Sequence, residues 1–173
     1  MNTTKFQGNP VTLKGDFINI NKGDRAPEVK VVKNDLSEKT IGGAKDKVQI
    51  IAFVPSLDTD VCATETRKFN QRVTELGDVD FTIVSMDLPF AQKRFCTTEG
   101  IDKLDVTSDY RNKEASEKYG VLISDSPLQG LSARAIFVVG KCGKIAYKQI
   151  VPEITAEPDY DEVIEAVKNA LNH

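Results

Sequence analysis

Residues 48–62 read VQIIAFVPSLDTDVC, and this stretch decides the fold. It begins with a nearly continuous apolar run, Val48–Val54, which is typical of a strand buried on both faces of a sheet. Pro55 has no backbone N–H to donate to a neighbouring strand, so we expect the strand to end there. From Cys62 onward apolar residues recur at helical spacing, which predicts a helix that ends near Leu76. We therefore expect Cys62 in the first turn of a helix that follows a buried strand.

This position favours the thiolate form of Cys62, because backbone N–H groups and the positive end of the helix dipole face it. Three carboxylates close in sequence oppose ionisation of the thiol: Asp58, Asp60 and Glu65. A positive group from elsewhere in the chain is therefore needed, and the candidates are Arg67 and Arg134. The alternative is an inert cysteine, since free cysteine is among the most buried residue types.

Length and composition limit the classes of protein that this chain can belong to. The 173 residues suit one well-buried domain, residues 1–173, and the net charge of −3 comes without a basic block that would bind nucleic acid. No apolar run approaches the roughly 20 residues of a membrane span, and the N-terminal residues lack the apolar core of a signal peptide. We expect a cytoplasmic protein, in which cysteines stay reduced.

The remaining chain alternates between strand and helix patterns, which predicts a three-layer α/β/α domain around a mixed sheet. An N-terminal hairpin is expected from Thr4–Gln7 and Val11–Leu13, with a turn at Gly8 and Asn9. The other expected strands are Val29–Val32, Asp80–Ser85, Val106–Asp109, Ala133–Val139 and Lys144–Val151. The other expected helices are Asn112–Tyr119, Asp161–Leu171 and one from Pro89 through Cys96.

Several familiar thiol chemistries do not fit these residues. Acyl transfer by a cysteine needs a histidine base, and the only histidine is His173 at the end of the chain. A dithiol oxidoreductase typically carries C-x-x-C, whereas Cys62 is followed by Ala63, Thr64 and Glu65. The three cysteines, at positions 62, 96 and 142, lack the paired spacing of a zinc site. What remains is a reaction that a lone thiolate can start without a base, which is attack on a weak O–O bond.

The pattern Pro55-x-x-x-Thr59-x-x-Cys62 resembles the P-x-x-x-T-x-x-C signature of the peroxiredoxins. The surrounding sequence resembles the thiol peroxidase branch of this family, the bacterial atypical two-cysteine type, over nearly the whole chain. The stretches that carry this likeness are residues 58–62, 67–70, 87–96 and 132–135. The resemblance implies a thioredoxin fold with the N-terminal hairpin, and thiol-dependent reduction of hydrogen peroxide and organic hydroperoxides.

The resemblance also implies a role for each matching residue. Cys62 would be the peroxidatic thiolate and Cys96 the resolving thiol, joined after oxidation by an intramolecular Cys62–Cys96 disulfide. Thr59 would offer its hydroxyl, Arg134 a fixed guanidinium with several donors, and Pro55 would shape and shield the pocket. Because the two cysteines are expected to begin different helices, forming the disulfide requires local unwinding.

Without the resemblance, two of these residues have plainer interpretations. Cys96 would be a core residue of an amphipathic helix beside Phe95, and Pro55 would only terminate a strand. Cys142 lies in a Gly-Lys-Cys-Gly turn and matches no functional position of the family, so we interpret it as an exposed bystander.

The implied partners are a hydroperoxide substrate, thioredoxin as electron donor and a second copy of the chain in a homodimer. No cofactor, metal, nucleic acid or membrane is expected, and the implied location is the bacterial cytoplasm. Two alternatives stay open: a thiol–disulfide oxidoreductase on the same fold, and a redox sensor or binding domain with inert thiols.

Overall fold

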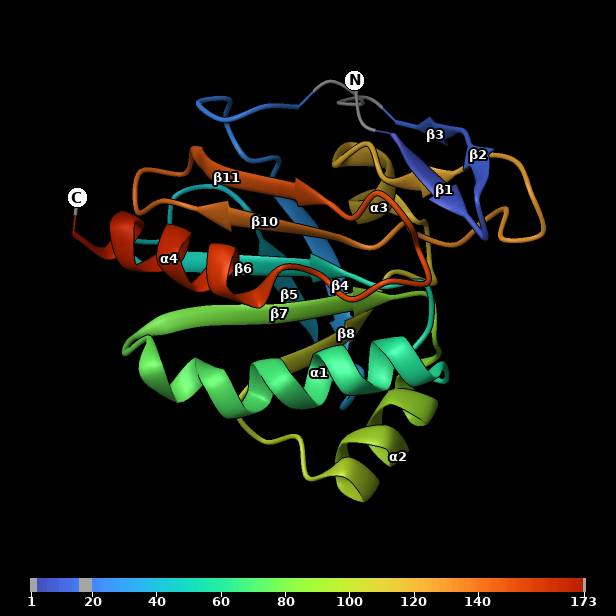
Figure 1. Ribbon diagram of the computed structural model, residues 1–173. Helices are drawn as coiled ribbons and strands as arrows, with labels where there is room; N and C mark the ends of the chain where they lie inside the picture. Colours follow the sequence, from blue (N-terminus) through green and yellow to red (C-terminus); the bar gives the residue numbers. More distant parts are fainter. Residues whose placement is uncertain (1–2, 16–19, 173) are drawn as a thin grey trace.

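A seven-stranded mixed sheet forms the centre of the computed structural model, which describes residues 3–15 and 20–172 (Figure 1). The strand order is β11-β10-β6-β7-β8-β4-β5. In chain order the strands are β4 (Val29–Lys33), β5 (Glu38–Ile41), β6 (Val48–Phe53), β7 (Val79–Ser85), β8 (Asp105–Ser108), β10 (Ala135–Val139) and β11 (Ile145–Ile150). Strands β6, β7 and β8 run parallel, and the other neighbours pair antiparallel. The carboxyl ends of the parallel strands therefore meet at one edge of the sheet.

Strand β6 is buried along its whole length because both faces of the sheet are covered. Ile50 and Ala52 point into a cluster that also holds Phe69 of α1 (Asp60–Arg72). Ile51 and Phe53 alternate with them and point into a second cluster on the opposite face. This double burial explains why the run is apolar at nearly every position rather than at every second one.

The helices and the short N-terminal strands form the two outer layers. Helix α1 and α4 (Tyr160–Leu171) lie on one face, with α2 (Pro89–Glu99) beyond α1 at the end of that layer (Figure 1). The short helix α3 (Glu114–Lys118) lies on the other face together with the strands β1 (Thr4–Phe6), β2 (Asn9–Val11), β3 (Leu13–Lys14) and β9 (Leu122–Ile123). The predicted three-layer α/β architecture with an N-terminal hairpin is confirmed.

Two local details of the strands differ from the sequence prediction. The hairpin turn lies at Gln7 and Gly8, not at Gly8 and Asn9, because both turn residues have positive φ (50° and 83°), as a tight two-residue hairpin turn requires. Leu13 leaves the hairpin and pairs with Ile123, so β3 and β9 form a separate two-stranded sheet that we did not predict. Two-residue strands carry too little periodicity to be recognised from sequence.

The helix boundaries also shift by a few residues. Helix α1 begins at Asp60 and ends at Arg72, and a 3₁₀ turn, η1 (Val73–Glu75), continues toward Leu76. Helix α3 covers only Glu114–Lys118 because Lys113 adopts a left-handed conformation (φ 53°) that breaks the expected longer helix. Within the described residues, no helix is long and apolar enough to cross a membrane.

Candidate active site

Cys62 lies in the first turn of α1, directly after the segment that follows the carboxyl end of β6. The helix is capped by Thr59, whose Oγ1 accepts a hydrogen bond from the Cys62 backbone N–H at 3.3 Å and donates one to the Ser56 carbonyl at 3.2 Å. The Cys62 side chain is 0% exposed. The predicted position of this thiol at the start of a helix is therefore what the structure has.

Arg134 brings a buried positive charge to the sulfur. Its Nη1 lies 3.1 Å from Cys62 Sγ, while its Nε donates to the Ile154 carbonyl at 2.9 Å. The residue is only 2% exposed, and it directly precedes β10, whose Ala135 pairs with Phe53 at the end of β6. The strand pairing thus fixes the guanidinium beside the turn that holds the cysteine.

Arg67, the other candidate cation, points away from the sulfur. Its Nη1 forms an ion pair with Glu99 Oε2 at 2.9 Å, and its Nη2 lies 3.3 Å from Thr64 Oγ1. Arg67 is five positions after Cys62, which places the two side chains on different sides of the helix. Of the two arginines, the structure brings only Arg134 to the thiol.

Glu65 also belongs to this site, although the sequence indicated only that its carboxylate would oppose ionisation of the thiol. Its Oε1 lies 3.2 Å from Arg134 Nη1, and its side chain is 0% exposed. Burial raises the pKa of Glu65 to about 7, although the adjacent Arg134 acts to lower it. A spacing of three residues from Cys62, one helical turn, is the sequence signal that could have found it.

Thr59 and Pro55 shape the backbone around the cysteine. The Thr59 hydroxyl carries one proton and donates it to the Ser56 carbonyl, so in this state it acts on the helix cap rather than on the sulfur. Pro55 is buried at the bend after β6, where Ser132 Oγ donates to the Val54 carbonyl at 2.9 Å. Both residues therefore help to set the path of the chain from the strand into α1.

Cys96 lies in the last turn of α2, so the expectation that it begins its helix is wrong. The helix starts with Pro89 and ends at Glu99, and the capping residue Gly100 adopts a left-handed conformation (φ 67°). Cys96 packs against the same apolar cluster as Cys62, and partial burial raises the pKa of its thiol, opposed by a hydrogen bond from Asn34. All three cysteines are free thiols, and Cys142 is exposed in the turn between β10 and β11.

Two adjoining hollows flank the start of α1. The larger, of about 680 Å³, lies between the segment before α1 and helix α2, and the smaller, of about 440 Å³, reaches Thr59 and Ala63 beside the cysteine. They share the residues Leu57, Asp58, Phe95 and Glu99. Small polar molecules can therefore approach the turn that holds Cys62 from the α2 side.

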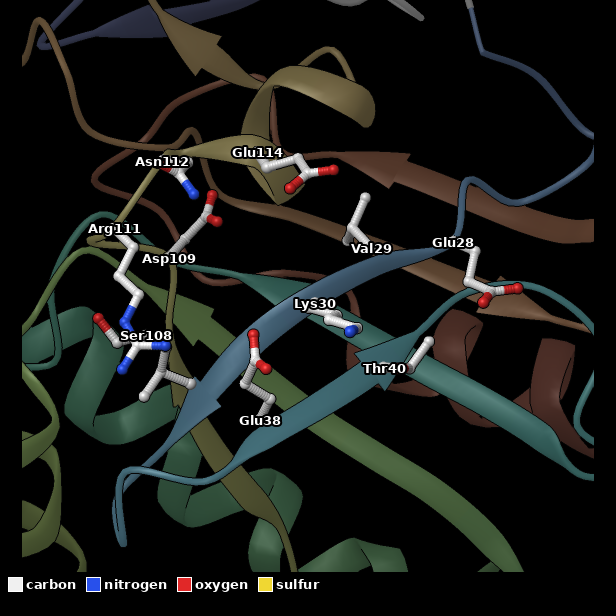
Figure 2. Close-up of a pocket in the computed structure, with 11 residues that line it drawn as sticks. Glu28, Val29, Lys30, Glu38, Thr40, Ser108, Asp109, Arg111, Asn112 and Glu114 are labelled. Atoms are coloured by element: carbon white, nitrogen blue, oxygen red, sulfur yellow. The ribbon is translucent and has the colours of Figure 1, made fainter.

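A third hollow, of about 280 Å³, lies across β4 and β5 and is lined by none of the cysteines (Figure 2). Its walls carry charges of both signs, with Lys30 between Glu38 and Glu28, and with Arg111 near Ser108. The buried Asp109 carboxylate accepts the backbone N–H groups of Ala115 and Ser116, so it caps α3. Among the described residues no group of His, Cys, Asp and Glu side chains is arranged to hold a metal ion.

Comparison with known proteins agrees with this geometry. Residues 21–164 match the family described as Redoxin, and the chain belongs to this family. Within the family its relatives are thiol peroxidases. The thiol peroxidase of Aquifex aeolicus is 56% identical over 98% of each chain, and that of Campylobacter jejuni is 54% identical over 92% of this chain and 89% of the relative.

Solved structures give the same result for the fold. The crystal structure of a peroxiredoxin-like protein from Aquifex aeolicus superposes with a TM-score of 0.94 at 56% identity and covers 98% of each chain. A thiol peroxidase from Chromobacterium violaceum shares the fold, with a TM-score of 0.85 at 18% identity over 98% of this chain and 97% of its own. The predicted thioredoxin-type fold of the peroxiredoxins is confirmed.

Proposed function

We propose that this protein is a thiol peroxidase that reduces hydrogen peroxide and organic hydroperoxides to water and alcohols. The observation that carries the proposal is the 3.1 Å contact between Arg134 Nη1 and Cys62 Sγ in a buried site at a helix start. The family membership and the names of the relatives support the same activity.

In the first step the Cys62 thiolate attacks one peroxide oxygen and the O–O bond breaks. Cys62 becomes a sulfenic acid, and the leaving hydroxide or alkoxide takes up a proton. Negative charge moves from sulfur to the leaving oxygen during this step, so a fixed guanidinium beside the sulfur lowers the barrier. Arg134 is held for this task by its bond to the Ile154 carbonyl. Thr59 and Pro55 keep the cysteine turn in place around the reacting atoms.

In the second step the Cys96 thiol attacks the sulfenic acid, a disulfide forms and water leaves. Disulfide geometry brings the two Cα atoms within about 7 Å, and Cys96 belongs to a formed helix, so we expect the end of α2 to unwind. Cys142 takes no part in this cycle.

A dithiol protein must then return two electrons to the Cys62–Cys96 disulfide, and we propose thioredoxin for this role. We further propose that two copies of the chain form a homodimer in the bacterial cytoplasm. Two large apolar side chains beside the larger hollow, Leu88 at 53% and Phe90 at 69% exposed, offer a surface that a second copy would cover. Free thiols suit a reducing compartment.

A coupled assay tests the function directly. Reduced protein, thioredoxin and thioredoxin reductase are mixed with hydrogen peroxide or an alkyl hydroperoxide, and peroxide loss is followed. A peroxidase consumes peroxide over many turnovers. A thiol–disulfide oxidoreductase would reduce a disulfide substrate without consuming peroxide, and a sensor would be oxidised once and stop.

A further inference from the structure

One guanidinium nitrogen serves two side chains that can each carry a negative charge. Arg134 Nη1 lies 3.1 Å from Cys62 Sγ and 3.2 Å from Glu65 Oε1, and all three side chains are buried. With both acids ionised, the cluster would hold two negative charges against one positive charge. Burial makes such an excess costly, because water cannot screen it.

The second carboxyl oxygen of Glu65 is also poorly placed to carry a negative charge. In the described part of the chain, Glu65 Oε2 is buried and has no hydrogen-bond partner. Two other titratable groups interact electrostatically with Glu65: the Glu157 carboxylate, from the segment between β11 and α4, and the Tyr160 phenol, at the start of α4. Lys68 of α1 is paired with Glu157. Within residues 3–15 and 20–172, Arg134 is therefore the one cation that lies against the Glu65 carboxyl group, and the buried, unbonded Oε2 gives the raised pKa of Glu65 a geometric basis.

We propose that Glu65 is a positioning residue that shares a single negative charge with Cys62 opposite Arg134, so that Glu65 is protonated whenever Cys62 is a thiolate. Two states then carry the same proton count: thiol with carboxylate, and thiolate with carboxylic acid. Both are neutral when Arg134 is included. The proton that leaves the thiol is balanced by the proton on the carboxyl, and no other reactant is required.

Glu65 acts through Arg134 rather than by touching the peroxide. An ionised Glu65 competes for Nη1 and opposes the thiolate, whereas a protonated Glu65 leaves the guanidinium to the sulfur. The two groups therefore titrate as a coupled pair, over a wider pH range than one isolated group. The inference rests on the proposed function only in taking Cys62 as the reacting thiol.

The first test follows thiolate absorbance in the ultraviolet against pH, without peroxide, in a protein whose other cysteines are replaced (Cys96→Ser, Cys142→Ser). In Glu65→Gln the amide keeps an oxygen for Arg134 and loses the charge, so thiolate should form at lower pH. We expect the thiolate midpoint to fall by up to about two pH units, because Cys62 Sγ and Glu65 Oε1 both lie against Arg134 Nη1. A unit charge about 6 Å away, acting through an effective dielectric constant of about 20, changes an ionisation equilibrium about a hundredfold. Glu65→Asp keeps the charge and should titrate near the wild type. Glu157→Gln removes a more exposed carboxylate and is the matched control, so its thiolate midpoint should also stay near the wild-type value.

The second test observes Glu65 itself, by the infrared C=O band of a protonated carboxyl group. The band should be present near neutral pH in the wild type and absent in Glu65→Gln. No thiolate forms in Cys62→Ser, so there the carboxyl band of Glu65 should disappear at a lower pH than in the wild type. The size of this shift should equal the shift that Glu65→Gln causes in the thiolate midpoint, because the coupling between two sites is reciprocal.

A Glu65→Gln protein that folds and titrates like the wild type overturns the inference. The inference is also overturned if the carboxyl band has the same pH dependence in the wild type and in Cys62→Ser. This second outcome can be measured even if the Glu65→Gln protein does not fold. Both tests are independent of peroxide, so a thiolate shift in a protein without peroxidase activity would sink the proposed function and leave this inference standing.

Discussion

The start of α1 and the end of α2 hold their cysteines in opposite ways. At the start of α1, Cys62 is enclosed by a capped turn and by an arginine that is anchored to the backbone. At the end of α2, Cys96 is half-buried in a last turn that contacts α1 through side chains. These contacts include the Arg67–Glu99 ion pair, the hydrogen bond that Asn70 Nδ2 donates to the Gly100 carbonyl, and the one that Asn70 Oδ1 accepts from the Lys103 N–H. The proposed attack of Cys62 on peroxide needs a fixed site, and the proposed attack of Cys96 on the oxidised Cys62 needs a segment that can move.

If the end of α2 unwinds as proposed, the hydrogen bonds place the boundary between its fixed and movable parts within the helix. The buried Gln92 donates to the Thr107 carbonyl at 2.6 Å, which ties the first half of the helix to β8. Just before the helix, Asp87 accepts hydrogen bonds from Ser56 Oγ and from the Leu57 N–H, on the segment that leads to Cys62. We therefore expect unwinding to begin after Gln92 and to leave the cysteine turn of α1 in place.

The largest effect on peroxidase activity is expected from Cys62→Ser, which removes the thiol at the start of α1. Serine cannot form a comparable nucleophilic anion near neutral pH, so peroxide consumption should fall to the background rate. Circular dichroism should show that the fold survives, because the substitution is nearly isosteric. A folded Cys62→Ser protein that keeps most of its peroxidase activity would remove Cys62 from the mechanism.

Arg134→Lys should cost the first oxidation step about 10²-fold or more, the scale of losing one preorganised transition-state donor. Lysine keeps the charge but loses the planar fork that binds the sulfur and the Ile154 carbonyl together. Stopped-flow measurement of the second-order rate constant with peroxide checks this, with thermal unfolding measured in parallel. Arg67→Lys is the matched control on α1 and should leave the rate unchanged. Equal rates for both variants would place Arg134 outside the site.

Cys96→Ser should leave the first oxidation intact and block the second. One equivalent of peroxide should convert Cys62 to a sulfenic acid that persists, and excess peroxide should over-oxidise it. In the wild type, non-reducing peptide mapping by mass spectrometry should find Cys62 linked to Cys96 within one chain and Cys142 free. A dominant Cys62–Cys142 link, or a Cys62–Cys96 link between two chains, would contradict the assignment.

The smallest effect is expected from Arg67→Ala, which loosens the movable region without touching the thiols. An exposed ion pair contributes about 1 kcal/mol or less to the free energy of unfolding. Hydrogen exchange in residues 93–100 should nevertheless become faster, and disulfide formation after oxidation should speed up. Arg72→Ala removes a similar α1 arginine, paired with Glu75 and Asp161, and should lose equally little stability without changing exchange in α2. If both variants behave alike, the Arg67–Glu99 pair does not restrain Cys96.

Local patterns in the sequence predicted the features that depend on neighbouring residues. The apolar run of β6, the stop after it and the helix that carries Cys62 all follow from periodicity and from the chemistry of proline. Pro89 at the start of α2 was recognised in the same way, since proline suits the first position of a helix. The resemblance to the family added the proposed roles of Thr59, Cys96 and Arg134, which spacing alone could not assign.

Only the tertiary structure decided which charges meet the thiol. Arg67 is close to Cys62 in sequence and turns away, whereas Arg134 reaches the sulfur because β10 pairs with β6 and places Ala135 opposite Phe53. The burial of Glu65 follows from the same packing, because its three-residue spacing from Cys62 gives its side of the helix but not which elements cover that side. Sequence periodicity describes one element at a time, but the protonation of a buried site depends on every element packed around it.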